Sequence, residues 1–265
     1  MMHKAKKKFG QNFLVDENII ADIIGAIRPE IDDNLVEIGP GLGALTRPLL
    51  KRLKCLHVVE IDRDIIARLE NDYPQPNSKL IIHAGDALKF DLATLAAPLR
   101  IVGNLPYNIS SPLLFHFAAS ADRITDMHFM LQNEVVERMV ADPSTPAYGR
   151  LSVMLQYRFY MEKLLDVPPE SFRPAPKVNS AIVRLIPLPA DKIIVHNEKL
   201  FAEIVGTAFG QRRKTLRNTL RSFINEDEFA QLGINPQLRA ENLSVAEFAR
   251  IASYLDERHV ETVSA

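Results

Sequence analysis

The stretch Asn34-Leu-Val-Glu-Ile-Gly39-Pro-Gly41-Leu-Gly43 indicates how this chain of 265 residues folds. Its first half is a short apolar run that is typical of a buried strand, and its glycines end that strand in a tight turn. A helical run from Ala44 to Leu53 follows directly. A strand, a glycine-rich turn and a helix in this order let the backbone approach a bound ligand closely.

Strands and helices alternate on both sides of this stretch. Asp16 can cap a helix from Glu17 to Arg28, and Asp62 can cap another that runs to about Asn71. Further strands are predicted at Cys55–Glu60, Leu80–His83, Leu99–Val102, Asp126–Gln132, Tyr160–Val167 and Ser180–Leu188, and a helix at Asn133–Val140. This alternation predicts an α/β domain with a parallel sheet.

The pattern changes after Pro187-Leu-Pro189. Beyond this point the sequence has helical runs and no convincing strand; the runs are near Leu200–Phe209, Lys214–Phe223, Glu226–Leu232 and Val245–Leu255. We therefore expect two domains, an α/β domain over residues 1–189 and a small helical domain over residues 190–265.

Composition excludes several classes of protein. Hydrophobic residues make up 47% and charged residues 25% of the chain, which is ordinary for a globular protein. No apolar run approaches the roughly 20 residues that span a bilayer, and no apolar signal core follows the basic N-terminus. The single cysteine, Cys55, excludes an intramolecular disulfide. We expect a cytoplasmic protein without a metal site, and a monomer by default.

The stretch Val102-Gly-Asn104-Leu-Pro-Tyr107-Asn-Ile-Ser-Ser follows a predicted strand and precedes a helical run. Proline disfavours the helical conformation for the residue before it, so Leu105 is held extended and the backbone leaves the strand as a stiff hook. The hook can aim the Asn104 side-chain oxygen and a neighbouring carbonyl at an exocyclic amino group. Tyr107 can stack on the ring that carries this group, for example adenine. The alternative is an ordinary strand-to-helix turn with a core tyrosine.

Acidic residues follow the neighbouring strands. Glu60 ends the strand after the glycine-rich turn, where a carboxylate can accept hydrogen bonds from both hydroxyls of a ribose. Asp86 follows the next strand and suits an adenine amino group, although a helix cap explains it nearly as well. Pro40 removes one backbone N–H donor from the turn, and the turn contains no basic residue. Such a site fits a cationic sulfonium nucleoside, S-adenosylmethionine, better than a pyrophosphate.

Basic residues form two clusters in a chain whose net charge is −1. One is N-terminal, and the other opens a predicted helix in the second domain; their members are Lys4, Lys6, Lys7 and Lys8, and Arg212, Arg213, Lys214, Arg217 and Arg221. A solvated helix face is the usual explanation for one such cluster. Two clusters, in a protein whose predicted site suits an aminated ring, favour binding to the phosphates of a nucleic acid.

Six motifs occur in order along the chain: Phe9–Leu14, Glu37–Gly43, Val59–Asp62, Gly85–Ala87, Asn104–Asn108 and Phe172–Ser180. With these motifs the chain closely resembles the bacterial small-subunit ribosomal RNA adenine dimethyltransferases, the kasugamycin-resistance enzymes. The resemblance implies a Rossmann-like methyltransferase domain and a small all-helical C-terminal domain. It also implies dimethylation of N6 of two adjacent adenosines near the 3′ end of small-subunit (16S) rRNA, with S-adenosylmethionine as methyl donor, during subunit biogenesis.

The same resemblance implies roles for individual residues. The expected cofactor contacts are Asn12, Leu14, Gly39, Gly41, Glu60, Asp86 and Asn104. Asn104 and the Leu105 carbonyl are expected to hold the target amine, with Tyr107 and Phe172 against the flipped adenine. Arg212, Arg213, Lys214, Arg217 and Arg221 are expected to contact rRNA in a small ribosomal subunit that has not yet matured.

Other functions stay open at this point. A related class of enzymes methylates a large-subunit adenosine and shares the cofactor and the motif at Asn104–Tyr107. A ribosome-assembly factor, whose binding to immature subunits matters more than its catalysis, is the second alternative. A nicotinamide dehydrogenase is the third, and it leaves Asn104–Tyr107 unexplained.

Overall fold

The computed structural model describes Lys6 and residues 11–76, 78–106, 109–192, 195 and 197–264, with side chains up to Arg258. The chain divides into two compact units. The first combines Met1–Val136 with Met161–Pro187, and the second combines Glu137–Tyr160 with Leu188–Ala265. No helix in the described ranges is both long enough and apolar enough to cross a membrane.

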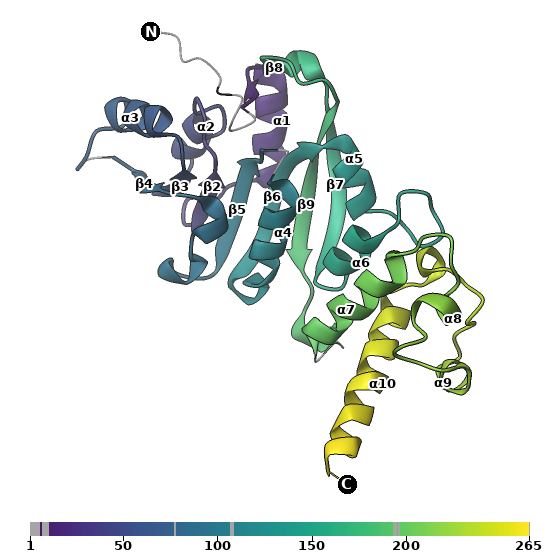
Figure 1. The fold of residues 1–265 in the computed structure, drawn as a ribbon. Helices are drawn as coiled ribbons and strands as arrows, with labels where there is room; N and C mark the ends of the chain where they lie inside the picture. Colours follow the sequence, from purple (N-terminus) through teal and green to yellow (C-terminus); the bar gives the residue numbers. More distant parts are fainter. Residues whose placement is uncertain are drawn as a thin grey trace. The chain divides into compact units, whose positions relative to one another are not determined.

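A seven-stranded sheet forms the centre of the first unit (Figure 1). Its strands are β2 (Leu35–Ile38), β3 (Leu56–Glu60), β4 (Leu80–Ala84), β5 (Leu99–Asn104), β6 (Ile124–Gln132), β7 (Phe159–Val167) and β9 (Ser180–Pro187), in the order β4-β3-β2-β5-β6-β9-β7. Neighbours from β4 to β6 run parallel, as predicted, whereas β9 is antiparallel to β6. The sheet is therefore mixed. The proline-rich connection before β9 contains no crossover helix of the kind that joins parallel neighbours.

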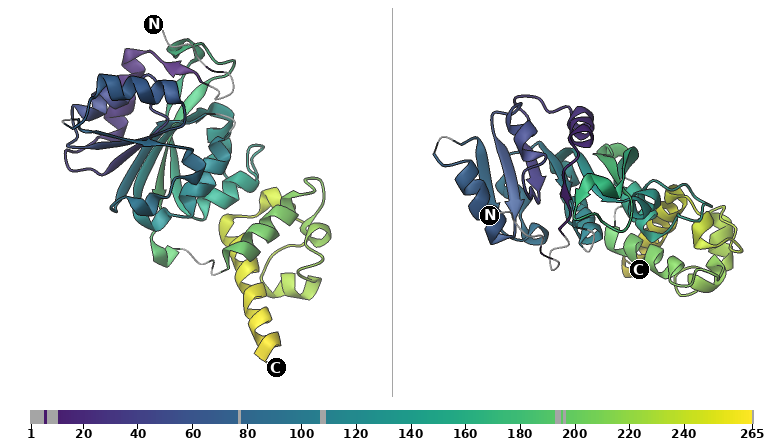
Figure 2. Two further views of the ribbon diagram at one scale, coloured as in Figure 1. Left: turned by 60° about the vertical axis from the view of Figure 1, so that its left-hand side comes forward. Right: turned by 90° about the horizontal axis from the view of Figure 1, so that it is seen from above.

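Helices cover both faces of this sheet (Figure 2). Three helices, α1 (Glu17–Ile27), α2 (Thr46–Leu50) and α3 (Arg63–Asp72), share one apolar core with side chains of the sheet. On the opposite face, α4 (Ser110–Ala118) packs against β6, where the rings of Phe117 and Phe129 stack with centroids 5.5 Å apart. The 3₁₀ helices of this unit are η2 (Ala87–Lys89), η3 (Leu92–Thr94), η4 (Ala121–Arg123) and η5 (Pro169–Ser171).

Two short strands form a separate sheet that the sequence did not predict. Strand β1 (Phe13–Leu14) pairs antiparallel with β8 (Phe172–Arg173). Beyond the pair, the Val15 backbone N–H donates a hydrogen bond to the Ser171 carbonyl at 2.8 Å. The first and the last motif of the sequence are thus joined across about 160 residues, and residues 11–14 are fastened beside the carboxyl ends of the large sheet.

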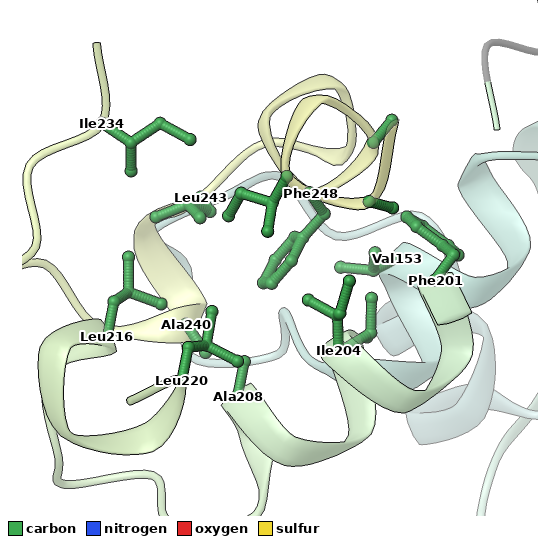
Figure 3. Close-up of a cluster of buried hydrophobic side chains, with 14 of the residues drawn as sticks. Val153, Phe201, Ile204, Ala208, Leu216, Leu220, Ile234, Ala240, Leu243 and Phe248 are labelled. Atoms are coloured by element: carbon green, nitrogen blue, oxygen red, sulfur yellow. The ribbon is translucent and has the colours of Figure 1, made fainter. Parts of the chain in front are cut away.

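Helices build the second unit around a core of its own (Figure 3). They are α6 (Arg150–Gln156), α7 (Glu198–Phe209), α8 (Leu216–Thr219), α9 (Glu226–Gln231), α10 (Val245–Ser264), η6 (Ala190–Lys192) and η7 (Ala240–Asn242), while α5 (Asn133–Met139) begins in the first unit and ends in the second. Phe248 of α10 lies among the labelled side chains of α6 and α7, Val153, Phe201 and Ile204.

The predicted division at residue 189 differs from these units in one segment. Residues 137–160 precede β7 in the chain, so the sequence assigned them to the first domain. In the structure they belong to the second unit, because apolar side chains such as Tyr148 and Val153 are buried in the helical core. The local pattern predicts that a helix has an apolar face, but it does not predict against which core that face packs.

The prediction of a helix at Lys214–Phe223 was wrong in extent. Only α8 is helical there, and residues 211–214 form a turn after α7. The backbone N–H groups of Leu216 and Arg217 donate to the carbonyls of Leu238 and Pro236. Because these long-range bonds replace helical ones, the basic run Gln211–Arg217 does not open a helix as expected. Its first cations lie in a turn.

Substitution of Gly103 tests how closely β5 packs against β2. A Cβ atom there would lie 2.5 Å from the Ile38 carbonyl oxygen, whereas a Cβ at Gly25 in α1 would meet nothing within 4 Å. We expect Gly103→Ala to lower the free energy of unfolding by about 1–3 kcal/mol, as overpacking does. The control Gly25→Ala should raise it by about 0.5–1 kcal/mol, because alanine favours a helix. Urea denaturation of both variants measures this; equal stability of Gly103→Ala and wild type would contradict the tight contact.

Candidate functional site

A cavity of about 290 Å³ opens at the carboxyl ends of the parallel strands. Successive strands depart from β2 in opposite directions, to β3 on one side and β5 on the other, and ligands of open α/β sheets bind at such a switch point. The lining consists of residues 11–14, 37–42, 44, 45, 59–61, 85–88, 104–106, 109 and 113. Every cofactor contact predicted from the sequence is among them.

The turn after β2 has the backbone conformation that its glycines allow. Gly39, Gly41 and Gly43 all have positive φ angles, of 65°, 53° and 82°, which other residues rarely adopt. A Cβ at Gly41 would lie 3.2 Å from the ring of Phe13. The predicted glycine-rich turn is therefore confirmed, and its backbone closes one wall of the cavity.

The strand register brings three functional side chains to one face of the sheet. Glu37 in β2 is opposite Val58 in β3 and Val102 in β5. Glu60 and Asn104 each lie two residues further along those neighbouring strands. Because side chains alternate along a strand, Glu37, Glu60 and Asn104 share the face that α1, α2 and α3 cover.

Glu60 is held in place by the backbone that follows it. Its Oε1 accepts hydrogen bonds from the backbone N–H groups of Ile61 and Asp62, both at 2.8 Å. Burial raises the pKa of Glu60, and these hydrogen bonds oppose the rise. The carboxylate is thus a fixed acceptor in the cavity wall, which suits the ribose hydroxyls that the sequence analysis assigned to it.

Glu37 also lines the cavity, although the sequence analysis gave it no role. It is 2% exposed, and its Oε2 accepts a hydrogen bond of 2.7 Å from the Thr46 hydroxyl. Burial raises the pKa of Glu37 to about 7, and the nearby Glu60 carboxylate adds to the rise. An acid at the end of a strand of otherwise apolar residues was the signal that could have identified it.

Asp62 fastens the N-terminal segment next to the cavity. Its carboxylate accepts hydrogen bonds from Lys6 Nζ at 2.5 Å and from Gln11 Nε2 at 2.9 Å. Burial opposes ionisation of Asp62, but these two donors and the Asp64 N–H hold its pKa below the usual value. The sequence predicted only a helix cap here. The structure adds an anchor for residues 11–14.

Asn104 and Leu105 both line the cavity at the end of β5, where the hook was predicted. Asn104 Nδ2 donates a hydrogen bond of 3.1 Å to the Asn12 carbonyl, which fixes the orientation of the amide. Its Oδ1 accepts no hydrogen bond from the described part of the chain and is left for a donor in the cavity. The Leu105 N–H donates to the Met130 carbonyl at 3.2 Å, and its buried side chain anchors the hook.

The structure describes one of the two aromatic residues that were expected to contact the adenine. Tyr107 lies outside the described residues. Phe172 is fully buried in the core that Leu14 and Val102 also join, and it does not line the cavity. The expectation that Phe172 presents its ring to a ligand is not met in this structure, because pairing of β8 with β1 turns the ring into the core.

Asp86 is the helix cap that the sequence allowed, and it also lies in the cavity lining. Its Oδ1 accepts a hydrogen bond of 3.0 Å from the Leu88 N–H, so it caps η2. It also lines the cavity. The capping bond fixes the carboxylate in place, and a fixed acceptor at this edge fits an adenine amino group.

The cavity is acidic. Glu37, Glu60 and Asp86 line it, whereas its described lining contains no Lys, Arg or His. Carboxylates without basic partners favour a cationic ligand and disfavour a phosphate. Within the described ranges, no group of three or more His, Cys, Asp or Glu could hold a metal ion.

The predicted rRNA-contacting residues lie in the second unit, on its surface. Arg217 forms an ion pair of 2.7 Å with Glu226. The others, Arg212, Arg213, Lys214 and Arg221, are exposed and form no ion pair within the described part of the chain. Unpaired cations on a turn are available to phosphates.

Comparison with known proteins gives a consistent result. The family model described as ribosomal RNA adenine dimethylase matches residues 2–257. "Ribosomal RNA small subunit methyltransferase A" of Aromatoleum aromaticum is 63% identical, covering 96% of this chain and 95% of that protein. The protein of the same name in Chromobacterium violaceum is 60% identical, covering 97% of both.

Two solved structures resemble this chain over most of its length. A dimethyladenosine transferase from Plasmodium falciparum has a TM-score of 0.82 at 26% identity, covering 93% of this chain and 98% of that one. The 23S rRNA methyltransferase ErmE has a TM-score of 0.70 at 26% identity, covering 92% and 100%.

Glu60 provides a test of the cavity as a cofactor site. We expect Glu60→Gln to weaken binding of S-adenosylmethionine on the order of tenfold to a hundredfold, because it removes a charged acceptor for ribose hydroxyls. Glu70→Gln, an exposed change on α3, should leave the affinity unchanged. Isothermal titration calorimetry measures both. An unchanged affinity in Glu60→Gln would remove Glu60 from the cofactor site.

Proposed function

The chain belongs to the ribosomal RNA adenine dimethylase family, and from this premise we propose how its residues carry out the reaction. It is an S-adenosylmethionine-dependent rRNA (adenine-N6,N6)-dimethyltransferase. One observation carries the proposal for the site: within the described residues the Asn104 Oδ1 accepts no hydrogen bond, and Asn104 lines an acidic cavity.

Small-subunit rRNA is the substrate that the comparisons favour. The small-subunit relatives are about 60% identical to this chain over nearly its full length, whereas ErmE, which acts on 23S rRNA, is 26% identical. We propose that the targets are two adjacent adenosines near the 3′ end of 16S rRNA.

We propose that residues of the first unit hold the cofactor, which supplies an electrophilic methyl group when bound. The Glu60 carboxylate would accept hydrogen bonds from the ribose hydroxyls, and the Asp86 carboxylate would accept one from the adenine amino group. Gly39 and Gly41 let the backbone approach closely. Asn12 and Leu14, fastened by Asp62 and by β8, close the cavity from the N-terminal side.

The target amine needs positioning more than it needs a base. The N6 lone pair of adenine is conjugated with the ring and attacks poorly. Its two N–H groups donate hydrogen bonds to Asn104 Oδ1 and to the Leu105 carbonyl. These bonds favour a pyramidal nitrogen whose lone pair points to the methyl group. The proton becomes acidic only after nitrogen is methylated, so it then passes to water. Good positioning of two reactants is worth on the order of 7–11 kcal/mol.

Stacking is proposed to hold the flipped base. Base flipping costs a few kcal/mol, which stacking on an aromatic ring recovers. Tyr107 follows the hook in sequence and is the first candidate. Phe172 can take part only if β8 separates from β1, because its ring is buried when the two strands are paired.

We propose that the second unit docks the enzyme on the ribosomal subunit. Its exposed cations, including Arg212 and Arg213, suit contacts with the rRNA backbone. An immature small subunit is the expected partner, the cytoplasm the expected location, and a monomer the expected active form.

Methyl transfer to isolated subunits tests the function. With radiolabelled S-adenosylmethionine, we expect label in unmethylated small subunits, approaching four methyl groups each, and none in large subunits. Asn104→Ala should lose most of this activity, because it removes an acceptor for the amine. Label in the large subunit alone would contradict the proposed substrate. Tight binding to small subunits without any label would favour an assembly factor.

The docking role is tested by reversing charge at Arg212 and Arg213 together. We expect weaker binding to small subunits, with the slope of log affinity against log salt reduced by about 1–2, because each lost phosphate contact contributes about one unit. The matched control is charge reversal at Lys51 and Arg52, an exposed pair in the first unit. Equal affinity and equal salt dependence in both variants would exclude this basic run from docking.

A further inference from the structure

Three carboxyl groups line the cavity, and the proposed cofactor contacts account for two of them. Glu60 and Asp86 accept hydrogen bonds from neutral groups, the ribose hydroxyls and the adenine amine. Glu37 has no such role, yet it stands on the same sheet face as Glu60 and Asn104, at the carboxyl end of β2. The cofactor also carries a positive charge, for which the described cavity lining provides carboxylates only.

The surroundings of Glu37 leave its charge largely uncompensated. From α2, the Thr46 hydroxyl donates one hydrogen bond, and Arg47 directs its guanidinium to the Leu42 carbonyl at 2.8 Å. From β3, Glu60 adds a second acid. Tyr73 follows α3, and burial chiefly raises the pKa of its phenol; the Arg47 guanidinium opposes the rise, and the carboxyl groups of Asp72 and then Glu37 add to it. Leu35 and Val102 contribute only apolar contacts to this face.

We propose that Glu37 is the residue with which this enzyme distinguishes the charged methyl donor from its neutral product. In the empty cavity the carboxyl group is partly protonated. Binding of the sulfonium cofactor favours the ionised carboxylate, and the proton passes to water. Methyl transfer removes the positive charge from sulfur, so Glu37 takes up a proton again when the thioether product is bound or has left.

The protonation of Glu37 supports this role. Its pKa of about 7, raised chiefly by burial, means that about half of the groups are ionised at pH 7. A nearby cation lowers that pKa, so binding of the cation releases a proton and strengthens as pH rises through 7. A neutral ligand lacks this dependence.

The inference rests on the proposed cofactor site, and binding alone can test it. We would measure the affinities of S-adenosylmethionine and S-adenosylhomocysteine for wild type, Glu37→Gln and the surface control Glu70→Gln. Glutamine keeps the size of the side chain and an acceptor for Thr46, but carries no charge. We expect Glu37→Gln to weaken binding of the methyl donor about tenfold and that of the product less than about twofold. Glu70→Gln should change neither affinity.

Proton release gives a second, independent measurement. Calorimetry in buffers of different ionisation enthalpy counts the protons released. The positive sulfur lowers the pKa of the α-amino group in the methyl donor, so the same measurement on Glu37→Gln supplies the contribution of the ligands, and the difference is corrected for it. For wild type we then expect donor binding at pH 7 to release about half a proton more than product binding.

The outcomes separate this inference from the proposed function. If wild type binds neither ligand, the cofactor site itself is wrong. If both ligands bind but Glu37→Gln weakens them by the same factor, or leaves both unchanged, Glu37 does not distinguish charge. If the variant fails to fold, wild type alone decides, through the affinity for S-adenosylmethionine divided by the affinity for S-adenosylhomocysteine. A rise of this ratio between about pH 6 and about pH 8 supports the inference, and a constant ratio overturns it.

Discussion

The close packing of β2 against β5 is the constraint on which the site depends. The Ile38 carbonyl approaches Gly103 so closely that even a methyl group there would clash. In the register of these two strands Glu37 is opposite Val102, and Asn104, two residues further along, is on the same face. A carboxylate and a carboxamide therefore lie on the same face of two neighbouring strands, and the sheet fixes the backbone position of both.

The rest of the site is added to this edge by contacts between distant parts of the chain. Asp62 holds Gln11, β8 holds β1, and the Asn12 carbonyl then fixes the amide of Asn104. Asn104 is oriented from two sides: the strand fixes its backbone, and the N-terminal segment decides which end of the amide faces the cavity. The same segment that closes the cavity thus makes Asn104 an acceptor for an amine.

The sequence predicted what local patterns encode. The glycine-rich turn, the strands from β2 to β6, and the acids at the ends of β3 and β4 followed from periodicity and from residue types with definite backbone preferences. It did not predict what depends on long-range packing. The ring of Phe172 is in the core because β1 covers it, and residues 137–160 join the second unit through buried apolar side chains. Glu37 was missed because its importance arises from burial beside Glu60.

The net charge of −1 conceals an uneven distribution of charged residues between the two units. An enzyme that transfers a methyl group from a cation to a polyanion must bind ligands of opposite charge. A cavity lined with cations would attract the phosphates of RNA into the cofactor site, and acids on a docking surface would repel them. Here carboxylates line the cavity of the first unit, whereas unpaired arginines and a lysine lie on a turn of the second. Because burial makes one of these carboxylates easy to neutralise, the cavity need not keep all of its negative charge when no cation is bound. The negative charge of the cavity then attracts the methyl donor when it binds, and it repels the RNA phosphates less when no cation is bound.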